Sequence, residues 1–301
     1  MVKSNIIYLL GEVKIMSSMR TYTPLRYPGG KNKLTGYVKK IIIANNLKGC
    51  IYIEPFAGGA AIALALLIDG YASEIIINDI DKSIYAFWYS VLNHTDELCY
   101  LIENTPINID QWHKQKDIQR HKDSANLLEL GFSTFFLNRT NRSGILKAGV
   151  IGGLEQNGKY KMDCRFNKKR LINQIRYISK YKNNIKIFNM DTIQLLDVVL
   201  PKIETKSFIF FDPPYYNKGS TLYVNYYNHE DHLKLSKKIG QIKEHCWIVT
   251  YDYVKAISKM YSQYFQTTYK LNYTAQRKYT GYEIMIYSNN LNIPKECKSV
   301  I

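Results

Sequence analysis

A carboxylate, two prolines and an aromatic ring stand together where one apolar segment of the chain ends. The segment is SFIFF at 207–211, which we expect to be a buried strand, and Asp212, Pro213, Pro214 and Tyr215 follow it. Asp212 and the Pro213 carbonyl are hydrogen-bond acceptors, and the prolines restrict φ and so fix where these oxygens point. The ring of Tyr215 offers a face for stacking another planar ring. The alternative is a strand-ending turn with an exposed acid.

A glycine turn and a second carboxylate follow two earlier apolar segments. Residues 51–61 (IYIEPFAGGAA) are typical of a strand, a tight turn and a helix start, and Asp79 ends the next predicted strand, about twenty residues after the glycines. This order opens a doubly wound α/β sheet, in which ligands bind outside the carboxyl ends of the strands. A carboxylate there can accept hydrogen bonds from both hydroxyls of a ribose. Each feature alone could be a tight βα connection or a helix N-cap, but their order predicts a nucleoside-containing cofactor.

The remaining pattern supports the same α/β class. Apolar residues at helical spacing predict helices, and short runs rich in Ile, Phe and Val predict strands. Predicted helices cover 35–46, 168–181 and 231–242; predicted strands cover 74–81, 185–191, 207–212 and 246–252, and two antiparallel strands lie within 264–289.

Length and cysteine content narrow the class of protein. A chain of 301 residues with 46% hydrophobic residues can bury a core and holds one elaborated domain or two smaller ones. The five cysteines show neither CxxC nor Cys/His spacing, so we expect no disulfide framework and no metal. The longest apolar stretch, at 60–68, is shorter than the roughly 20 residues that a membrane helix needs. We therefore expect a cytoplasmic protein without a membrane segment or signal peptide.

The net charge of +16 indicates a polyanionic partner. Residues 138–182 hold 12 Lys and Arg against two acids, Glu155 and Asp163. A composition rich in Lys, Asn and Ile accounts for part of the total charge, but it explains this local concentration much less well. The pattern favours a nucleic-acid-binding region in the middle of the chain.

Four motifs, in this order, resemble the Dam-type (D12 class) N6-adenine-specific DNA methyltransferases. TPLRYPGGK at 23–31 is similar to the family's N-terminal cofactor motif, and EPFAGG at 54–59 to its S-adenosylmethionine loop. NDID at 78–81 is similar to its ribose-binding acid, and DPPY at 212–215 to its catalytic tetrapeptide. Only DPPY is specific by itself, but the motif order extends from Thr23 to about Asn289.

The resemblance implies a Rossmann-like S-adenosylmethionine-dependent methyltransferase sheet with an inserted, mostly helical target-recognition domain. It implies an N-terminal extension at 1–19, a catalytic domain over 20–90 and 184–292, the insert over 91–183 and a tail at 293–301. It also implies double-stranded DNA as the partner, allows for a cognate restriction endonuclease, and leaves the oligomeric state and the recognition sequence open.

The resemblance further implies a mechanism for the tetrapeptide. An exocyclic adenine amine is a poor nucleophile, and acceptors on the amino group stabilise the charge that develops as its nitrogen attacks a methyl group. Asp212 and the Pro213 carbonyl would be these acceptors, Pro214 would stiffen the turn, and Tyr215 would stack on a flipped-out base. The N4 amine of cytosine needs nearly the same chemistry, and a relative without catalysis would keep the fold and bind DNA. We predict adenine N6 as the target, because an Asp at the first position of the tetrapeptide favours adenine and intact Asp212, Tyr215 and Asp79 argue against a loss of catalysis. Cytosine N4, an inactive relative and an RNA or protein substrate remain the alternatives.

By position, the family comparison assigns further residues to the cofactor. Tyr27 stands where better-known relatives carry a tryptophan, and Lys31 could instead be a solvated surface lysine. Asp191 is the expected partner of the cofactor's adenine amino group. The full predicted set is Tyr27, Lys31, Pro55, Phe56, Ala57, Gly58, Asp79, Asp191 and Asp212.

Arginine, lysine and asparagine side chains, mostly in the basic region, suit DNA. Arg and Lys bind phosphates, while Arg reads guanine and Asn reads adenine in the major groove, although most such contacts hold only the backbone. Arg139 could instead form an internal salt bridge, and Tyr223 and Asn225 could close over an extruded base. The predicted DNA-binding set is Arg26, Asn138, Arg139, Asn141, Arg142, Arg165, Lys168 and Lys169.

Overall fold

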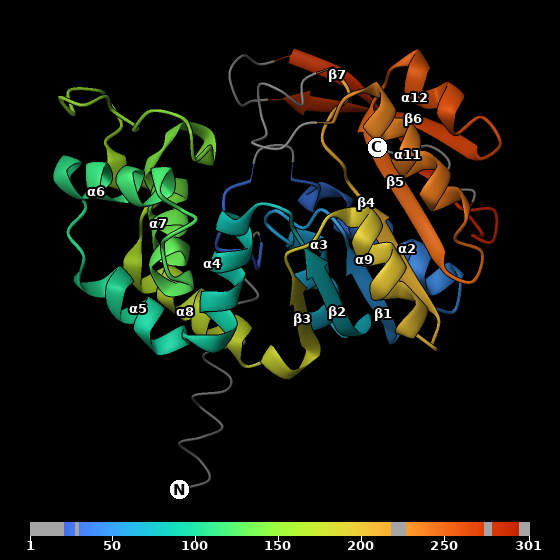
Figure 1. Ribbon diagram of the computed structural model, residues 1–301, viewed down its shortest axis with the longest axis horizontal. Coiled ribbons are helices and arrows are strands. Elements are labelled where there is room, and N and C mark those ends of the chain that lie inside the picture. The colour runs from blue at the N-terminus through green and yellow to red at the C-terminus, as the bar shows by residue number, and fades with distance from the viewer. Residues whose placement is uncertain (1–20, 28–29, 218–226, 274–278, 295–301) are drawn as a thin grey trace, which may run out of the picture.

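The protein is built around one seven-stranded sheet (Figure 1). The computed structural model describes residues 21–27, 30–217, 227–273 and 279–294, so the predicted extension at 1–19 and the residues Tyr223 and Asn225 lie outside it. The strand order is β3-β2-β1-β4-β5-β7-β6. The strands are β1 (Cys50–Glu54), β2 (Ala72–Asn78), β3 (Ile185–Phe188), β4 (Ser207–Phe211), β5 (Cys246–Asp252), β6 (Phe265–Tyr273) and β7 (Tyr279–Tyr287).

The sheet is doubly wound. β1 to β5 are parallel, and β7 is antiparallel to both of its neighbours. From β1 the strand order runs through β2 to β3 in one direction and through β4 to β5 in the other, so the order reverses between β1 and β4, where such sheets bind ligands. The predicted α/β class and the predicted strand pair at the C-terminal end of the chain are confirmed.

Helices cover both faces of the sheet. α2 (Thr35–Ala44) and α3 (Ala61–Ile68) pack on one face, and α9 (Thr192–Val198), α11 (His229–Gly240) and α12 (Lys255–Met260) on the other. None of the helices in the described ranges is long and apolar enough to cross a membrane.

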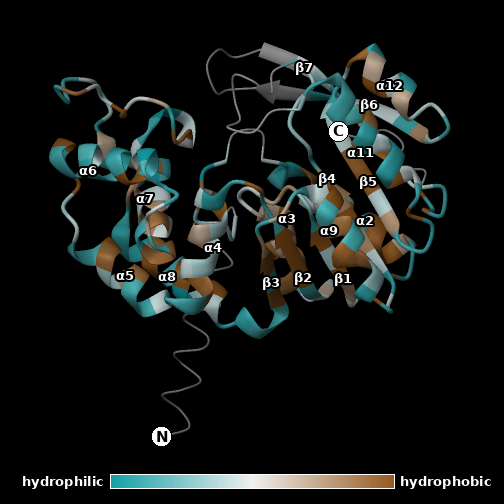
Figure 2. Cartoon of the chain, in the orientation of Figure 1, coloured by the Kyte–Doolittle hydropathy of each residue, from teal (hydrophilic) through white to brown (hydrophobic). Residues whose placement is uncertain are grey.

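Successive residues of the central strands face the two opposite cores. Tyr52 and Phe208 belong to the core with α2 and α3, whereas Ile53 and Ile209 belong to the core with α9 and α11. Strands that are buried on both faces need apolar residues at every position. Figure 2 shows the result, with hydrophobic residues gathered in the central strands and in α3.

Five further helices lie beside the sheet (Figure 1). They are α4 (Lys82–Asn93), α5 (Thr95–Asn104), α6 (Ile109–Arg120), α7 (Leu127–Thr140) and α8 (Lys168–Ser179). Phe135 of α7 and Leu171 of α8 share one continuous core with Tyr52 and Ile75 of the sheet. The predicted boundaries of a separate insert at 91 and 183 therefore remain a prediction.

α7 passes α4 at very short distance near Gly131. A Cβ added at Gly131 would lie 2.5 Å from the carbonyl oxygen of Ala86 and would also clash with Oγ of Ser90. Both obstacles belong to the buried face of α4, so neither can move without disturbing the helix. Gly131 therefore permits the contact that joins these two helices.

We expect Gly131→Ala to lower the free energy of unfolding by about 1–3 kcal/mol, because the extra methyl group overpacks the contact between α4 and α7. Urea denaturation followed by circular dichroism measures the change. The matched control is Gly36→Ala in α2, where an added Cβ meets no atom within 4 Å, and where stability should stay constant or rise by up to about 1 kcal/mol. Equal stability of the two variants would contradict the close packing of α4 and α7.

Candidate active site

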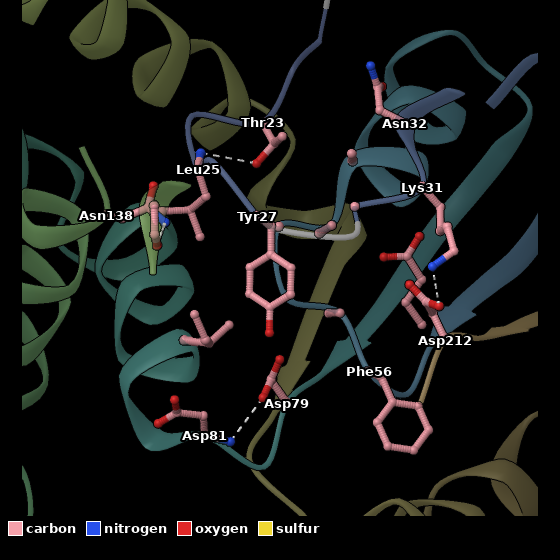
Figure 3. A pocket seen from close by; sticks show the side chains of 18 of the residues that line it. Thr23, Leu25, Tyr27, Lys31, Asn32, Phe56, Asp79, Asp81, Asn138 and Asp212 are labelled. Carbon is pink, nitrogen blue, oxygen red and sulfur yellow. Dashed lines mark hydrogen bonds and ion pairs between the residues drawn. The ribbon is translucent and has the colours of Figure 1, made fainter. Parts of the chain in front are cut away.

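A cavity of about 310 Å³ opens at the carboxyl ends of β1, β2 and β4 (Figure 3). Its walls come from segments that are far apart in the sequence: the stretch 21–32, the turn between β1 and α3, the residues after β2, the tetrapeptide after β4, and the loop 144–147. The predicted site residues that line it are Tyr27, Lys31, Phe56, Ala57, Asp79, Asn138, Asp212 and Pro214.

Asp79 is held in the cavity wall by backbone donors. The amide of Gly58 donates to its Oδ2 and the amide of Asp81 to its Oδ1, each over 2.9 Å. Burial raises the pKa of Asp79 to about 7, although these hydrogen bonds oppose the rise. The preceding Asn78 donates from Nδ2 to the carbonyl of Pro55 over 2.9 Å and so ties the end of β2 to the glycine turn. The carboxylate is therefore fixed in orientation beside the turn.

The ring of Tyr27 lies on the glycine turn and points toward Asp79 (Figure 3). A Cβ on Gly58 would come within 2.6 Å of the ring, and one on Gly59 within 3.2 Å of the Tyr27 Cβ. Gly58 also has a φ of +45°, a backbone conformation that is unfavourable for any residue with a side chain. Its carbonyl accepts a 2.9 Å hydrogen bond from Nε1 of Trp88. The turn predicted to bind a cofactor is thus also the platform for Tyr27.

Lys31 and Asp212 form an ion pair that joins the N-terminal segment to β4. Nζ of Lys31 lies 2.7 Å from Oδ1 of Asp212, and Lys31 is only 6% exposed, so it is not a solvated surface lysine. Oγ1 of Thr250, on β5, donates to the same Oδ1 over 2.8 Å. Burial raises the pKa of Asp212, whereas Lys31 and Thr250 oppose that rise.

Tyr215 is turned into the protein. It is 1% exposed, its hydroxyl donates to Oε1 of Glu283 over 2.7 Å, and Nζ of Lys31 lies 5.1 Å from its ring centre. The face predicted to stack on a base is covered in this structure because the ring belongs to the network around Lys31. The described aromatic residues that do line the cavity are Tyr27, Phe56, Phe210 and Tyr227.

Asp191 caps a helix. Its Oδ1 accepts a 2.8 Å hydrogen bond from the amide of Ile193 in the first turn of α9, as N-cap acids do. The side chain is exposed and Asp191 does not belong to the described lining of the cavity. Its contact with the adenine of a cofactor remains a prediction.

Two asparagines predicted to read DNA lie in the interior. Asn138 accepts from the amide of Arg26 and donates to the carbonyl of Arg26, each over 2.8 Å, and also donates to the carbonyl of Gly144 over 2.9 Å. Asn141 is fully buried; it accepts from Nε1 of Trp112 over 2.7 Å and donates to carbonyls of the loop 145–146. Their amide groups are engaged inside the chain, which argues against a role in reading bases.

Arg139 also has an internal role, though not in the salt bridge considered above. Its Nε donates to the carbonyl of Arg165 over 2.8 Å and its Nη1 to that of Pro24 over 3.2 Å. Burial lowers its pKa to about 9, and the nearby Arg26 adds to this effect. Arg139 thus holds the segment before Lys31 against α7, and its guanidinium group is engaged inside the protein.

Arg26 and Lys168 are partly buried and tied to backbone carbonyls. Nη1 of Arg26 donates to the carbonyl of Asn141 over 3.1 Å. Nζ of Lys168 donates to the carbonyls of Glu103 and Thr105 over 2.7 and 2.8 Å. These contacts stabilise the end of α5 and the junction between α7 and the N-terminal segment.

The other predicted basic residues lie on the surface. Arg142, Arg165 and Lys169 are exposed, and none of them is part of the cavity wall. Lys147, which is not among the predicted residues, is an exposed residue of the loop 144–147 that does line the cavity. A lysine among twelve basic residues carries no local signal that would distinguish it.

Three further residues of the site were missed: Glu54, Thr250 and Glu283. Glu54 is 6% exposed and lines the cavity; an acid at the end of a strand, directly before Pro55, could have indicated it. Thr250 and Glu283 lie within strands, where no local pattern separates them from other strand residues. No group of three or more His, Cys, Asp and Glu that could hold a metal occurs within the described ranges.

We expect Glu54→Gln to change how stability depends on pH. Oε1 of Glu54 accepts from the hydroxyl of Tyr52 over 3.1 Å and from the amide of Ala63 over 3.0 Å, and the amide oxygen of Gln can accept both. Burial raises the Glu54 pKa from its ordinary 4.5 to about 8, so the folded wild type holds an extra proton between these values and loses stability as pH rises through this window.

Urea denaturation between pH 5 and 9 tests this prediction. Glu54→Gln should match the wild type near pH 5 and exceed it by a few kcal/mol near pH 9, since a pKa difference of one between folded and unfolded states is worth about 1.4 kcal/mol. The control is Glu204→Gln, at an exposed position. A constant stability difference between Glu54→Gln and wild type across this range would contradict the raised pKa.

Comparison with known proteins places this site in a family. Residues 27–279 match the family model of the D12 class N6 adenine-specific DNA methyltransferases. The Type II methyltransferase M.MjaIII of Methanocaldococcus jannaschii is 27% identical over 231 residues, which cover 71% of this chain and 77% of that protein. The Type II methyltransferase M.CviBI of Paramecium bursaria Chlorella virus NC1A is 23% identical over 233 residues, which cover 74% and 80% of the two chains.

Among solved structures, a putative RNA methyltransferase from Pyrococcus horikoshii covers 82% of this chain and 80% of its own at 11% identity, with a TM-score of 0.37 that is too low to carry an argument. The family match, by contrast, covers most of the chain and includes the glycine turn, Asp79 and the tetrapeptide. The doubly wound sheet is accordingly a Rossmann-like methyltransferase sheet, and the chain belongs to the D12 class of N6 adenine-specific DNA methyltransferases.

Proposed function

We propose that this enzyme transfers a methyl group from S-adenosylmethionine to N6 of an adenine in a short, specific sequence of double-stranded DNA. The observation that carries the proposal is the position of Asp212. The carboxylate of the tetrapeptide, paired with Lys31, lies in the wall of the same cavity as Asp79 and the glycine turn. One cavity thus holds an acid that can bind a ribose and an acceptor that can bind an amine. This combination fits the transfer of a methyl group from a nucleoside cofactor to a nucleobase.

The described residues of the cavity fit S-adenosylmethionine. Each oxygen of Asp79 already accepts one backbone hydrogen bond and retains a lone pair that can accept a ribose hydroxyl. Phe56 and Tyr227, whose ring centres are 6.0 Å apart, form an aromatic wall against which the base of the cofactor can pack. When bound, S-adenosylmethionine supplies a methyl group on a positively charged sulfur, already activated toward a nucleophile. The chain therefore needs to bind and orient rather than to form a covalent intermediate.

Asp212 would orient the target amine. An acceptor on the amino group directs its lone pair out of the ring and stabilises the positive charge that grows on nitrogen during attack. The carboxylate stabilises this growing charge best while it is ionised, and Lys31 at 2.7 Å favours the ionised form. The carbonyl of Pro213 is the second acceptor of the proposal.

A base in a duplex reaches such a cavity only after it leaves the stack. We therefore include base flipping in the proposal. Because Tyr215 is covered in this structure, we place the extruded base against the aromatic lining of the cavity beyond the part assigned to the cofactor. Base–aromatic stacking of this kind is worth about 1–3 kcal/mol.

The exposed basic residues near the cavity define the proposed DNA surface. Lys147 lies in the cavity wall, and Arg142 precedes the same loop. Arg165, shortly before α8, and Lys169, in the first turn of α8, add exposed charge. We assign all four to phosphate or base contacts and omit the interior residues Asn138, Arg139 and Asn141.

The relatives suggest a setting for the enzyme. Both are named Type II methyltransferases, which supports a restriction-modification role with a cognate endonuclease, and we place the protein in the cytoplasm with the DNA that it modifies. Cytosine N4 as the target is the second candidate, and the adenine-specific family argues against it.

Asp212→Ala should lower kcat by at least about 100-fold, because it removes a preorganised acceptor from the transition state, while the Kd for DNA should change by less than about twofold. Single-molecule sequencing of DNA from a methylation-deficient host that expresses each form gives the modified base and its sequence. The control is Asp110→Ala, at an exposed position on α6. Modification at cytosine by the wild type, or full activity of Asp212→Ala, would contradict the proposal.

Arg142→Gln should weaken DNA binding at every salt concentration and reduce the slope of log K against log [salt] by about one, because one phosphate contact is lost. Binding of S-adenosylmethionine should not change. The matched control is Arg176→Gln, an exposed arginine near Asp96 of α5. A salt dependence equal to that of the wild type would remove Arg142 from the DNA surface.

A further inference from the structure

A buried network of side chains lies behind the tetrapeptide. Glu283 of β7 is fully buried; its Oε1 accepts from the hydroxyl of Tyr215 over 2.7 Å, and its Oε2 accepts from the hydroxyl of Tyr269. Nζ of Lys31 lies 3.7 Å from Oε1 of Glu283 and 3.4 Å from the hydroxyl of Tyr215. One ammonium group is thus shared between two carboxylates, those of Glu283 and Asp212.

The donors to Asp212 converge on one of its two oxygens. Lys31 donates to Oδ1 over 2.7 Å and Thr250 donates to Oδ1 over 2.8 Å (Figure 3 shows the Lys31 contact). No residue in the described part of the chain donates to Oδ2, and Asp212 lines the cavity. The carboxylate therefore has one engaged oxygen and one that is available to a ligand.

We propose that Glu283 and Thr250 are positioning residues for the methyl transfer proposed above, on which this inference rests. Thr250 and Lys31 together hold Oδ1 of Asp212. Glu283 restrains Lys31 on that oxygen, so that Oδ2 stays free to accept the amino group of the target base. Without Glu283, Lys31 can bridge both oxygens and compete with the amine.

The two residues act on Asp212 with opposite signs. The negative charge of Glu283 raises the pKa of Asp212, whereas the hydrogen bond from Thr250 lowers it. Replacing Glu283 should therefore lower this pKa, and replacing Thr250 should raise it. The other titratable groups that face Asp212 are unchanged in both replacements: Lys31 of the N-terminal segment, Tyr52 and Glu54 of β1, Tyr215 after β4, and Tyr269 of β6.

The test is kcat against pH for the wild type, Glu283→Gln and Thr250→Val, with saturating S-adenosylmethionine and genomic DNA from a methylation-deficient host. The pH dependence of kcat reports groups in the bound complex. Because protonation removes the negative charge that stabilises the transition state, the acid limb should move to lower pH in Glu283→Gln and to higher pH in Thr250→Val. The plateau value of kcat for Glu283→Gln should also fall by about tenfold, because Asp212 is less well oriented. The KM for DNA should stay within about twofold of the wild-type value. Thr250→Ser should restore the wild-type limb.

The controls separate positioning from a structural role. Glu204→Gln, exposed before β4, should keep the wild-type profile. Equal losses of kcat in Glu283→Gln and Thr250→Val, with the acid limb of each pH profile at its wild-type position, would overturn the inference. Thr250→Val replaces a hydroxyl group with a methyl group of similar size, so it decides the matter even if Glu283→Gln does not fold: an acid limb that does not rise overturns the proposal. A wild type that binds S-adenosylmethionine but methylates no adenine would overturn the proposed function instead.

Discussion

Asp212 lies largely buried at the end of a core strand. Its carboxylate depends on the ion pair with Lys31, a residue 181 positions earlier in the chain. A buried carboxylate without a partner costs several kcal/mol or shifts to its neutral form. The ion pair keeps the charge on Asp212, and it also determines the course of the N-terminal segment. The segment that carries Lys31 reaches the carboxyl edge of the sheet, where residues from 21–27 and 30–32 line the cavity.

The same segment attaches the helices beside the sheet. Asn138 holds the backbone of Arg26 on both sides, and Gly144 has no room for a Cβ because the carbonyl of Arg26 lies against it. Arg139 adds a hydrogen bond to the carbonyl of Pro24. Polar residues of the basic region thus divide into two groups. Those on the inner side of α7 hold the N-terminal segment that lines the site, and the exposed ones carry the charge available to a polyanion.

The elements and the core of the site could be predicted from sequence because their signals are local. The strand 207–211 and the acids after it are adjacent in the chain, and the carboxyl ends of parallel strands meet at one edge. Glu283 could not be found in this way, since its partners Tyr215 and Lys31 are close only in space. Asn138 and Asn141 were assigned to DNA because residue type does not distinguish a buried amide that satisfies backbone groups from an exposed one. Tyr215 was assigned a stacking face because the sequence does not show which side of the ring is covered.

The short path from Asn138 through Arg26 to Lys31 has a consequence for control of the enzyme. One end of the path touches α7 and the other touches the carboxylate that would receive the substrate amine. Thermodynamic linkage is reciprocal: a partner that favours one arrangement of α7 favours the matching arrangement of Asp212 by the same free energy. A change in the packing of α7 and a change at Asp212 would then be coupled rather than independent. The coupling would pass through Arg26 and Lys31, close to the first described residue, Thr21.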